Sequence, residues 1–266
     1  MFFSKIAKKK VSLIFLTQIL VMNHLLSNLL GDNNIRLFYN TLTSIFRRLS
    51  ALIHKRQMEF EWSRKDEPRW FNHFSDQYYQ FRENKNSTWL ERGVFNTLVL
   101  NKNSHVLEIG CGDGFNTFHF FSERCKKITA IDFDENALNY AKKYNSNSKI
   151  EYKRVNINDG LPDGRFDNVI WDGSIEQFTE PEIKLILLNI KKFLTSQGVL
   201  SGYTAKGCQP DKLNLSHNKR EFETKSELKS FLSSYFEKVE VLETNFHDKV
   251  SFYFFASDLE LPFAFN

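Results

Sequence analysis

Short apolar runs alternate with helical stretches from about residue 104 onward, and this alternation limits the possible folds more than any other feature. Strands are predicted at 105–109, 128–131, 150–155, 166–171, 198–203, 239–242 and 250–255, and helices at 115–124, 135–143, 181–194 and 225–235. This order predicts a parallel sheet wound on both faces. The last two strands have no helix between them, which favours an antiparallel pair. We therefore expect an α/β fold with a doubly wound, mostly parallel seven-stranded sheet, an antiparallel last strand pair and an N-terminal helical extension.

A glycine-rich turn follows the first predicted strand, in the sequence Glu108-Ile-Gly-Cys-Gly-Asp-Gly-Phe115. Its glycines allow a tight turn and a close approach of the backbone to a ligand, and the helix that follows offers free N–H groups. A dinucleotide site would need glycine where Phe115 stands, and a phosphate-binding G-x-x-x-x-G-K-[ST] loop is absent. The carboxylate of Glu108 also suits a cationic ligand better than a phosphate.

The second predicted strand ends at Asp132, 22 residues after Gly110. A carboxylate at this place can accept hydrogen bonds from both hydroxyls of a ribose. The alternative role is the N-cap of the next helix, but Asp134 already supplies that cap. We therefore predict that Asp132 faces a ligand.

These segments together resemble the class I S-adenosylmethionine (SAM)-dependent methyltransferases. Residues 106–114 are similar to motif I, residues 131–134 to the ribose-binding motif, and residues 154–162 to the segment that contacts adenine. Residues 166–172 resemble motif IV, and 198–202 the element of the fifth strand. The resemblance covers roughly residues 70–257. It implies SAM as the cofactor, bound by Glu108, Gly110, Cys111, Gly112, Asp132, Phe133, Asn156 and Ile157. The family often has Asp where Asn156 stands, which implies a weaker contact there or one made by a neighbour.

Methyl transfer from a sulfonium depends mainly on proximity and orientation, and a general base helps when the acceptor carries a proton. Candidate bases must follow the carboxyl ends of the strands, where open α/β sheets bind ligands. Asp172 follows the fourth strand, and His217 lies in the long polar connection 203–224, which we expect to cap the acceptor. Asp172 could instead serve only a turn, and His217 could be an ordinary loop residue.

The resemblance implies a methyltransferase that acts on a small-molecule acceptor, which the sequence does not identify. Two alternatives stay open: an enzyme like the aminopropyl transferases, and a non-catalytic SAM-binding scaffold. S-adenosylhomocysteine as the product would indicate methyl transfer, whereas methylthioadenosine would indicate aminopropyl transfer.

Residues 1–58 carry nine basic side chains and one acidic one, whereas the rest of the chain has a net charge of −4. Residues 11–30 are uncharged, and residues 35–56 have the apolar spacing of a basic amphipathic helix. Such a helix suits an anionic membrane surface. Packing on its own domain or on a partner is an alternative, as is a membrane span. We expect a helical extension over 1–58, with peripheral membrane contact through 11–56 as one reading, and a methyltransferase domain over 59–266.

The three cysteines, Cys111, Cys125 and Cys208, are too few and too scattered for a disulfide framework. They form no C-x-x-C pair, so no metal site is expected. This cysteine usage favours a reducing, cytoplasmic compartment. Basic and aromatic residues form no repeat in the domain, so no nucleic-acid partner is expected. The oligomeric state is not predicted.

Overall fold

A computed structural model describes residues 31–63, 73–206, 220–246 and 249–263. The chain divides into two compact units, 1–64 and 65–266. In the first unit, α2 (Asp32–Ser63) is one continuous helix of 32 residues, which includes the predicted amphipathic segment and runs through Met58. No helix of the described ranges has both the length and the apolar character needed to cross a membrane.

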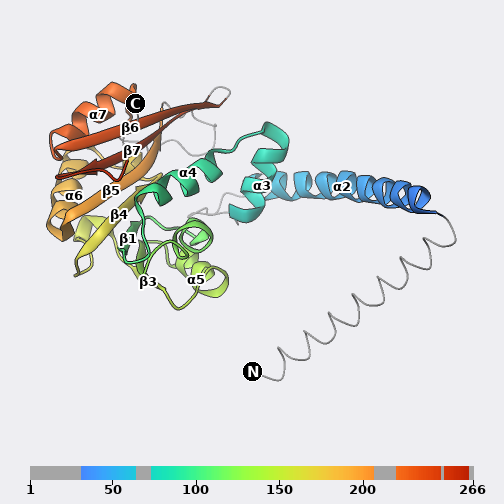
Figure 1. Cartoon of the computed structure of the whole chain (residues 1–266), viewed down its shortest axis with the longest axis horizontal. Coiled ribbons are helices and arrows are strands. Elements are labelled where there is room, and N and C mark those ends of the chain that lie inside the picture. Colours follow the sequence, from blue (N-terminus) through green and yellow to red (C-terminus); the bar gives the residue numbers. More distant parts are fainter. Residues whose placement is uncertain (1–30, 64–72, 207–219, 247–248, 264–266) are drawn as a thin grey trace, which may run out of the picture. The chain divides into compact units, whose positions relative to one another are not determined.

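The second unit is built on a seven-stranded sheet of order β3-β2-β1-β4-β5-β7-β6. Figure 1 shows β7 beside β5 and β6. Its strands are β1 (His105–Ile109), β2 (Lys127–Asp132), β3 (Ile150–Arg154), β4 (Phe166–Asp172), β5 (Leu194–Ala205), β6 (Lys238–Phe246) and β7 (Lys249–Ser257). Strands β3, β2, β1, β4 and β5 pair in parallel, and β7 is antiparallel to both β5 and β6. The predicted fold class is confirmed.

Side chains of β4 alternate between two apolar cores on opposite faces of the sheet. In β4, Val169 and Trp171 belong to the core beneath α6 (Glu180–Phe193) and α7 (Lys225–Ser233), whereas Ile170 belongs to the core beneath α5 (Glu135–Tyr144). All three side chains are fully buried, as expected where helices cover both faces of a parallel sheet.

Among the described residues of this unit, the α-helices α3 (His73–Asn84) and α4 (Thr88–Asn96) precede the sheet. A Cβ atom added to Gly93 would lie 2.5 Å from the ring of Phe120, so α4 packs closely on the segment after β1. Trp89 also meets the rings of Phe115 and Phe120 edge to face. The Trp89 side chain of α4 therefore contributes to packing.

The helix predicted at 115–124 is shorter and partly of another type. It contains a π-helical turn, Thr117–Phe121, in which Ser122 N–H donates to the carbonyl of Thr117 five residues back. Residues 122–124 form turns. A wider turn of this kind is often found at functional sites, and here it directly follows the glycine-rich loop.

The strand order reverses direction between β1 and β4, since the chain moves from β1 to β2 on one side and reaches β4 on the other. In open α/β sheets, ligands bind at this switch point, outside the carboxyl ends of the strands. The carboxyl ends of β1, β2 and β4 are therefore the place to look for a site.

Candidate cofactor and acceptor site

The glycine-rich loop after β1 is held in a left-handed path. Gly110, Gly112 and Gly114 have φ values of +73°, +54° and +73°, which side chains with a Cβ atom adopt only with strain. A Cβ atom on Gly114 would also collide with the hydroxyl of Tyr152. The backbone N–H of Gly110 donates to the carbonyl of Ile131 at 2.9 Å, so the loop is fixed to the end of β2.

Asp132, at the end of β2, is held by two backbone groups. Its Oδ2 accepts from the N–H of Gly112 at 2.8 Å, and its Oδ1 accepts from the N–H of Asp134 at 2.9 Å. Burial raises the pKa of Asp132, and these hydrogen bonds oppose that rise. Each carboxylate oxygen has a second lone pair, so both can still accept a hydroxyl. Asp134 caps α5 through the N–H groups of Asn136 and Ala137, as the sequence predicts.

A hollow of about 380 Å³ opens between the carboxyl ends of these strands. Five of the predicted cofactor-binding residues line it: Gly110, Asp132, Phe133, Asn156 and Ile157. The side chain of Asn156 accepts from the N–H of Asn158 at 3.1 Å, so its oxygen also serves its own turn.

Four lining residues come from the turn after β4 and were not predicted: Gly173, Ser174, Gln177 and Phe178. No motif marks this turn in the sequence. Its position directly after the strand that resembles motif IV is the one signal that could have indicated it. The hydroxyl of Ser174 is buried and has no hydrogen-bond partner among the residues that the structure describes.

Glu108, Cys111 and Gly112 are not among the residues that line this hollow. Glu108 is 3% exposed, and its Oε2 has no hydrogen-bond partner within the described ranges. Burial raises the pKa of Glu108 to about 8. A buried carboxyl oxygen without a donor is costly, and a ligand that brings an N–H donor would remove that cost. Cys111 is packed in the core, and burial raises the pKa of its thiol.

Asp172 ends β4 and is 6% exposed. Its Oδ2 accepts from Nε and a terminal nitrogen of Arg92, at 2.9 and 2.8 Å. The amides of Asn96 and Asn116 lie 3.4 and 3.3 Å from the same carboxylate. Burial lowers the pKa of Arg92, but the charge of Asp172 and its hydrogen bond raise it by more, so the net shift is upward.

Arg92 reaches this place from α4, and its role was not predicted. Its guanidinium lies 4.9 Å from the centre of the Tyr203 ring, and a Cβ atom on Gly173 would lie 2.6 Å from its terminal nitrogen. Nearby, Thr204 donates to Glu176 at 3.3 Å, and burial raises the pKa of Glu176. The second predicted catalytic residue, His217, lies outside the described residues, as does most of the predicted cap.

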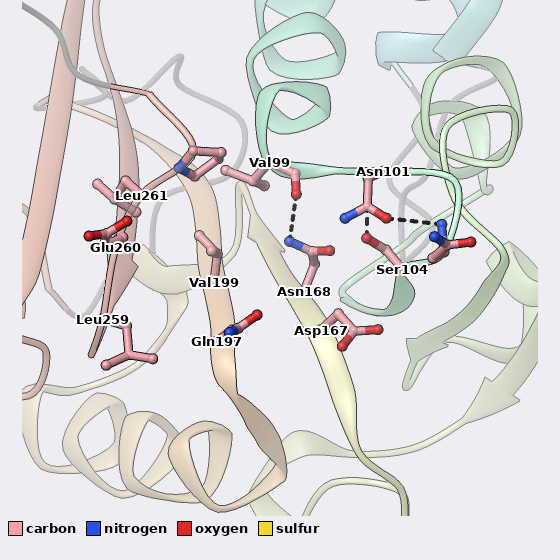
Figure 2. A pocket seen from close by; sticks show the side chains of 12 residues that line it. Val99, Asn101, Ser104, Asp167, Asn168, Gln197, Val199, Leu259, Glu260 and Leu261 are labelled. Atoms are coloured by element: carbon pink, nitrogen blue, oxygen red, sulfur yellow. Dashed lines mark hydrogen bonds between the residues drawn. The ribbon is translucent and has the colours of Figure 1, made fainter.

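A larger hollow of about 820 Å³ lies elsewhere, among Val99, Asn101, Asn168, Val199 and Leu261 (Figure 2). There the amide of Asn168 donates to the carbonyl of Val99 at 2.8 Å. Asp167 lines this hollow from the start of β4, whereas Asp172 stands at the other end of the same strand. This hollow is therefore separate from the site at the carboxyl ends.

A family model described as a methyltransferase domain matches residues 100–249, which is more than half of the chain. The chain belongs to this methyltransferase family. It is a methyltransferase by this membership, which agrees with the resemblance seen in its motifs.

Solved structures of similar fold agree with this membership. DhpI in complex with SAH has 14% sequence identity and a TM-score of 0.56, over 78% of this chain and 98% of that chain. The N-methyltransferase NodS from Bradyrhizobium japonicum WM9, in complex with S-adenosyl-L-homocysteine, has 18% identity and a TM-score of 0.52, over 77% and 98%. At these identities the likeness concerns the fold alone. A search of curated protein sequences found no match.

Proposed function

We propose that this methyltransferase modifies a polar small molecule that binds beside Asp172 and Arg92. The observation that supports this most is the convergence of polar groups from α4, β4, β5 and the turn after β4. Arg92 forms an ion pair with Asp172, and Thr204 donates a hydrogen bond to Glu176. The charge of Glu176 also contributes to the raised pKa of Arg92. A few convergent polar groups suit the recognition of a small ligand better than that of an extended polymer.

The residues around the smaller hollow fit the parts of SAM. Asp132 would accept the ribose hydroxyls, and Phe133, Asn156 and Ile157 would border the adenine. The glycines at 110 and 112 would admit the cofactor close to the backbone, and Glu108 would accept from its amino group. SAM supplies a methyl group on a sulfonium, and this chain's residues would orient the acceptor toward it.

Asp172 and His217 remain our candidates for a general base. Asp172 has the required place at the end of β4, yet its contact with Arg92 gives it a second task, to hold that guanidinium. The two tasks can be separated by experiment. Loss of a proton acceptor changes how the rate depends on pH, whereas loss of a positioning group changes the rate or the affinity and leaves the pH dependence as it was.

The test is a search for acceptors with methyl-labelled SAM. The purified full chain is incubated with small-molecule extract and, separately, with protein and nucleic-acid fractions. We expect S-adenosylhomocysteine as the product and label only in the small-molecule fraction. Label in a macromolecular fraction would contradict the proposed acceptor class, and methylthioadenosine as the product would contradict methyl transfer.

We also propose that residues 1–58 act as an extension, that 59–266 form the methyltransferase domain, and that the protein works in the cytoplasm. Cys111 and Cys125 are buried and free, which supports a reducing compartment. Fractionation of cells that produce the chain, with detection of a tag on residues 59–266, tests the location.

A further inference from the structure

One side of α2 exposes a long apolar stripe. At 100° per residue its side chains fall within an arc of about 140°. Its exposed members are Phe38, Tyr39, Leu42, Ile45, Phe46, Leu49, Leu52, Ile53 and Phe60. The exposed fractions include 60% for Phe46 and 61% for Ile53. A continuous apolar surface of this kind marks an interaction site more often than scattered single residues do.

The charges of α2 are one-sided as well. Between residues 33 and 58 the helix has no acidic side chain, but it has five basic ones: Arg36, Arg47, Arg48, Lys55 and Arg56. On the same helical projection, Arg48 and Lys55 lie beyond one border of the stripe, and Arg36 and Arg47 lie beyond the other. Arg56 falls within the arc of the stripe, where it pairs with Glu59 at 2.9 Å. Long basic side chains in these places can reach anionic groups while the stripe is buried.

A second copy of the helix would be a poor partner for this surface. Over residues 33–58 its flanks would bring arginine and lysine side chains together, with acidic residues only at the ends of the helix (Asp32, Glu59 and Glu61), and like charges at such positions oppose association. The stripe is also wider than the narrow seam of a two-stranded coiled coil. Four of its exposed members are aromatic, a class of residue that prefers the boundary between lipid and water.

We propose that α2 lies on the surface of an anionic membrane, with the apolar stripe in the headgroup boundary and the basic side chains against the lipid headgroups. Binding then rests on apolar burial and on charge together. The charge contribution is about fivefold in affinity for each basic residue near the lipid, and salt weakens it.

The test is flotation of the full chain with vesicles of phosphatidylcholine alone and of phosphatidylcholine mixed with phosphatidylserine. We expect the chain to float with the mixed vesicles and to dissociate as salt rises. Arg47→Gln with Arg48→Gln should weaken binding to the mixed vesicles by roughly 25-fold.

A matched pair of variants separates the stripe from the rest of the helix. Ile53→Glu changes a side chain within the stripe that is 61% exposed, and Leu37→Glu changes one that is 65% exposed and lies outside it. Both add the same charge, and neither removes a buried group. We expect Ile53→Glu to bind the mixed vesicles at least about tenfold more weakly than the unaltered chain. Leu37→Glu should bind at least about fivefold more tightly than Ile53→Glu.

Three results would overturn the proposal. The chain could fail to float with the mixed vesicles, or the two glutamate variants could weaken flotation equally. Sedimentation could also show that Ile53→Glu converts a dimer to a monomer while flotation stays the same, which would assign the stripe to a second copy. Circular dichroism of both variants checks that α2 still forms.

Discussion

Arg92 directs two nitrogens at a single oxygen of Asp172, with Nε at 2.9 Å and a terminal nitrogen at 2.8 Å. The two residues are 80 positions apart in the chain, and their ion pair joins α4 to the carboxyl end of β4. Glu91, the residue before Arg92 in α4, is also held in place. Its carboxylate accepts hydrogen bonds from the hydroxyls of Thr244 and Tyr253 at 2.8 Å each. Helix α4 is thus fixed to β4 in the middle of the sheet and to β6 and β7 on one side of it.

Removal of Arg92 should destabilise the fold. In Arg92→Met the carboxylate of Asp172 stays buried without its cation, and we expect a loss of up to about 3 kcal/mol in the free energy of unfolding. Urea denaturation measures this loss. Asp172→Asn added to Arg92→Met should restore part of it, because the unpaired charge is then gone. If the loss in the double variant equals the sum of the losses in Arg92→Met and Asp172→Asn, the two side chains are not coupled by their ion pair.

Removal of the Asp132 carboxylate should weaken SAM binding by more than about tenfold, because hydrogen bonds to a charged group contribute about 1.5–3 kcal/mol each. Calorimetry with Asp132→Ala measures the affinity. Asp134→Ala is the control, since it removes only the cap of α5 and should cost about 1 kcal/mol of stability with little change in affinity. An unchanged affinity in Asp132→Ala would restrict this carboxylate to fixing the loop. A valine at Gly112 is a less specific test, because the φ of +54° would strain the loop itself.

Binding of SAM should release a proton near neutral pH. Burial raises the pKa of Glu108 to about 8, so the free protein holds this carboxyl protonated at pH 7. An approaching amino group favours the charged form and lowers that pKa. Calorimetry in two buffers of different ionisation enthalpy should then report release of about one proton per SAM bound. In Glu108→Gln this release should disappear and the affinity should fall.

The same group should affect stability in the absence of SAM. Because the pKa of Glu108 is raised in the folded state from its ordinary 4.5, the folded protein binds more protons than the unfolded chain between the two values. Stability from this group is therefore complete below about pH 4.5 and is lost as the pH rises through about 8. Glu108→Gln should raise the Tm at pH 9 by several degrees and have little effect at pH 4. A Tm difference that does not vary with pH would contradict the buried-carboxyl account.

If Asp172 is the general base, Asp172→Asn should lower kcat by about 10²–10⁴ and change the shape of the pH–rate profile. SAM affinity should stay near that of the unaltered protein, because Asp172 does not line the smaller hollow. A reduced kcat with an unchanged pH profile would instead indicate that Asp172 positions Arg92. The profile requires the acceptor identified by the labelling experiment.

The fold was predictable because its signals are local. His105–Ile109 was predicted as a strand with the bounds that β1 has, and Asp134 was predicted to cap α5. Strand β6 is longer than the predicted 239–242, since Glu243, Thr244 and Asn245 interrupt its apolar pattern. Backbone pairing with β7 continues past them. An edge strand can hold polar side chains without loss of stability, because they remain in contact with water.

The candidate site was predictable only in part. The glycine-rich loop and Asp132 at the end of β2 could be predicted, because their residue types and their spacing are visible in a single sequence. The pairing of Arg92 with Asp172 depends on how α4 folds back over the sheet, and no local pattern encodes that path. The π-helical turn after the loop was missed for a similar reason, because the same side chains also fit an α-helix.

Strand β7 lies between β5 and β6, although it is the last strand in the chain. A ribosome therefore makes β6 before the strand that β6 pairs with, and the outer edge of β5 also waits for β7. Until residue 257 has emerged, the outer edge of β5 and both edges of β6 stay open to other chains. A nascent or truncated chain that ends before Lys249 would keep every segment that resembles a SAM-binding motif and yet lack the strand that joins β6 to the sheet. Aggregation during synthesis, more than loss of cofactor binding, is then the main hazard of shortening this protein from its C-terminal side.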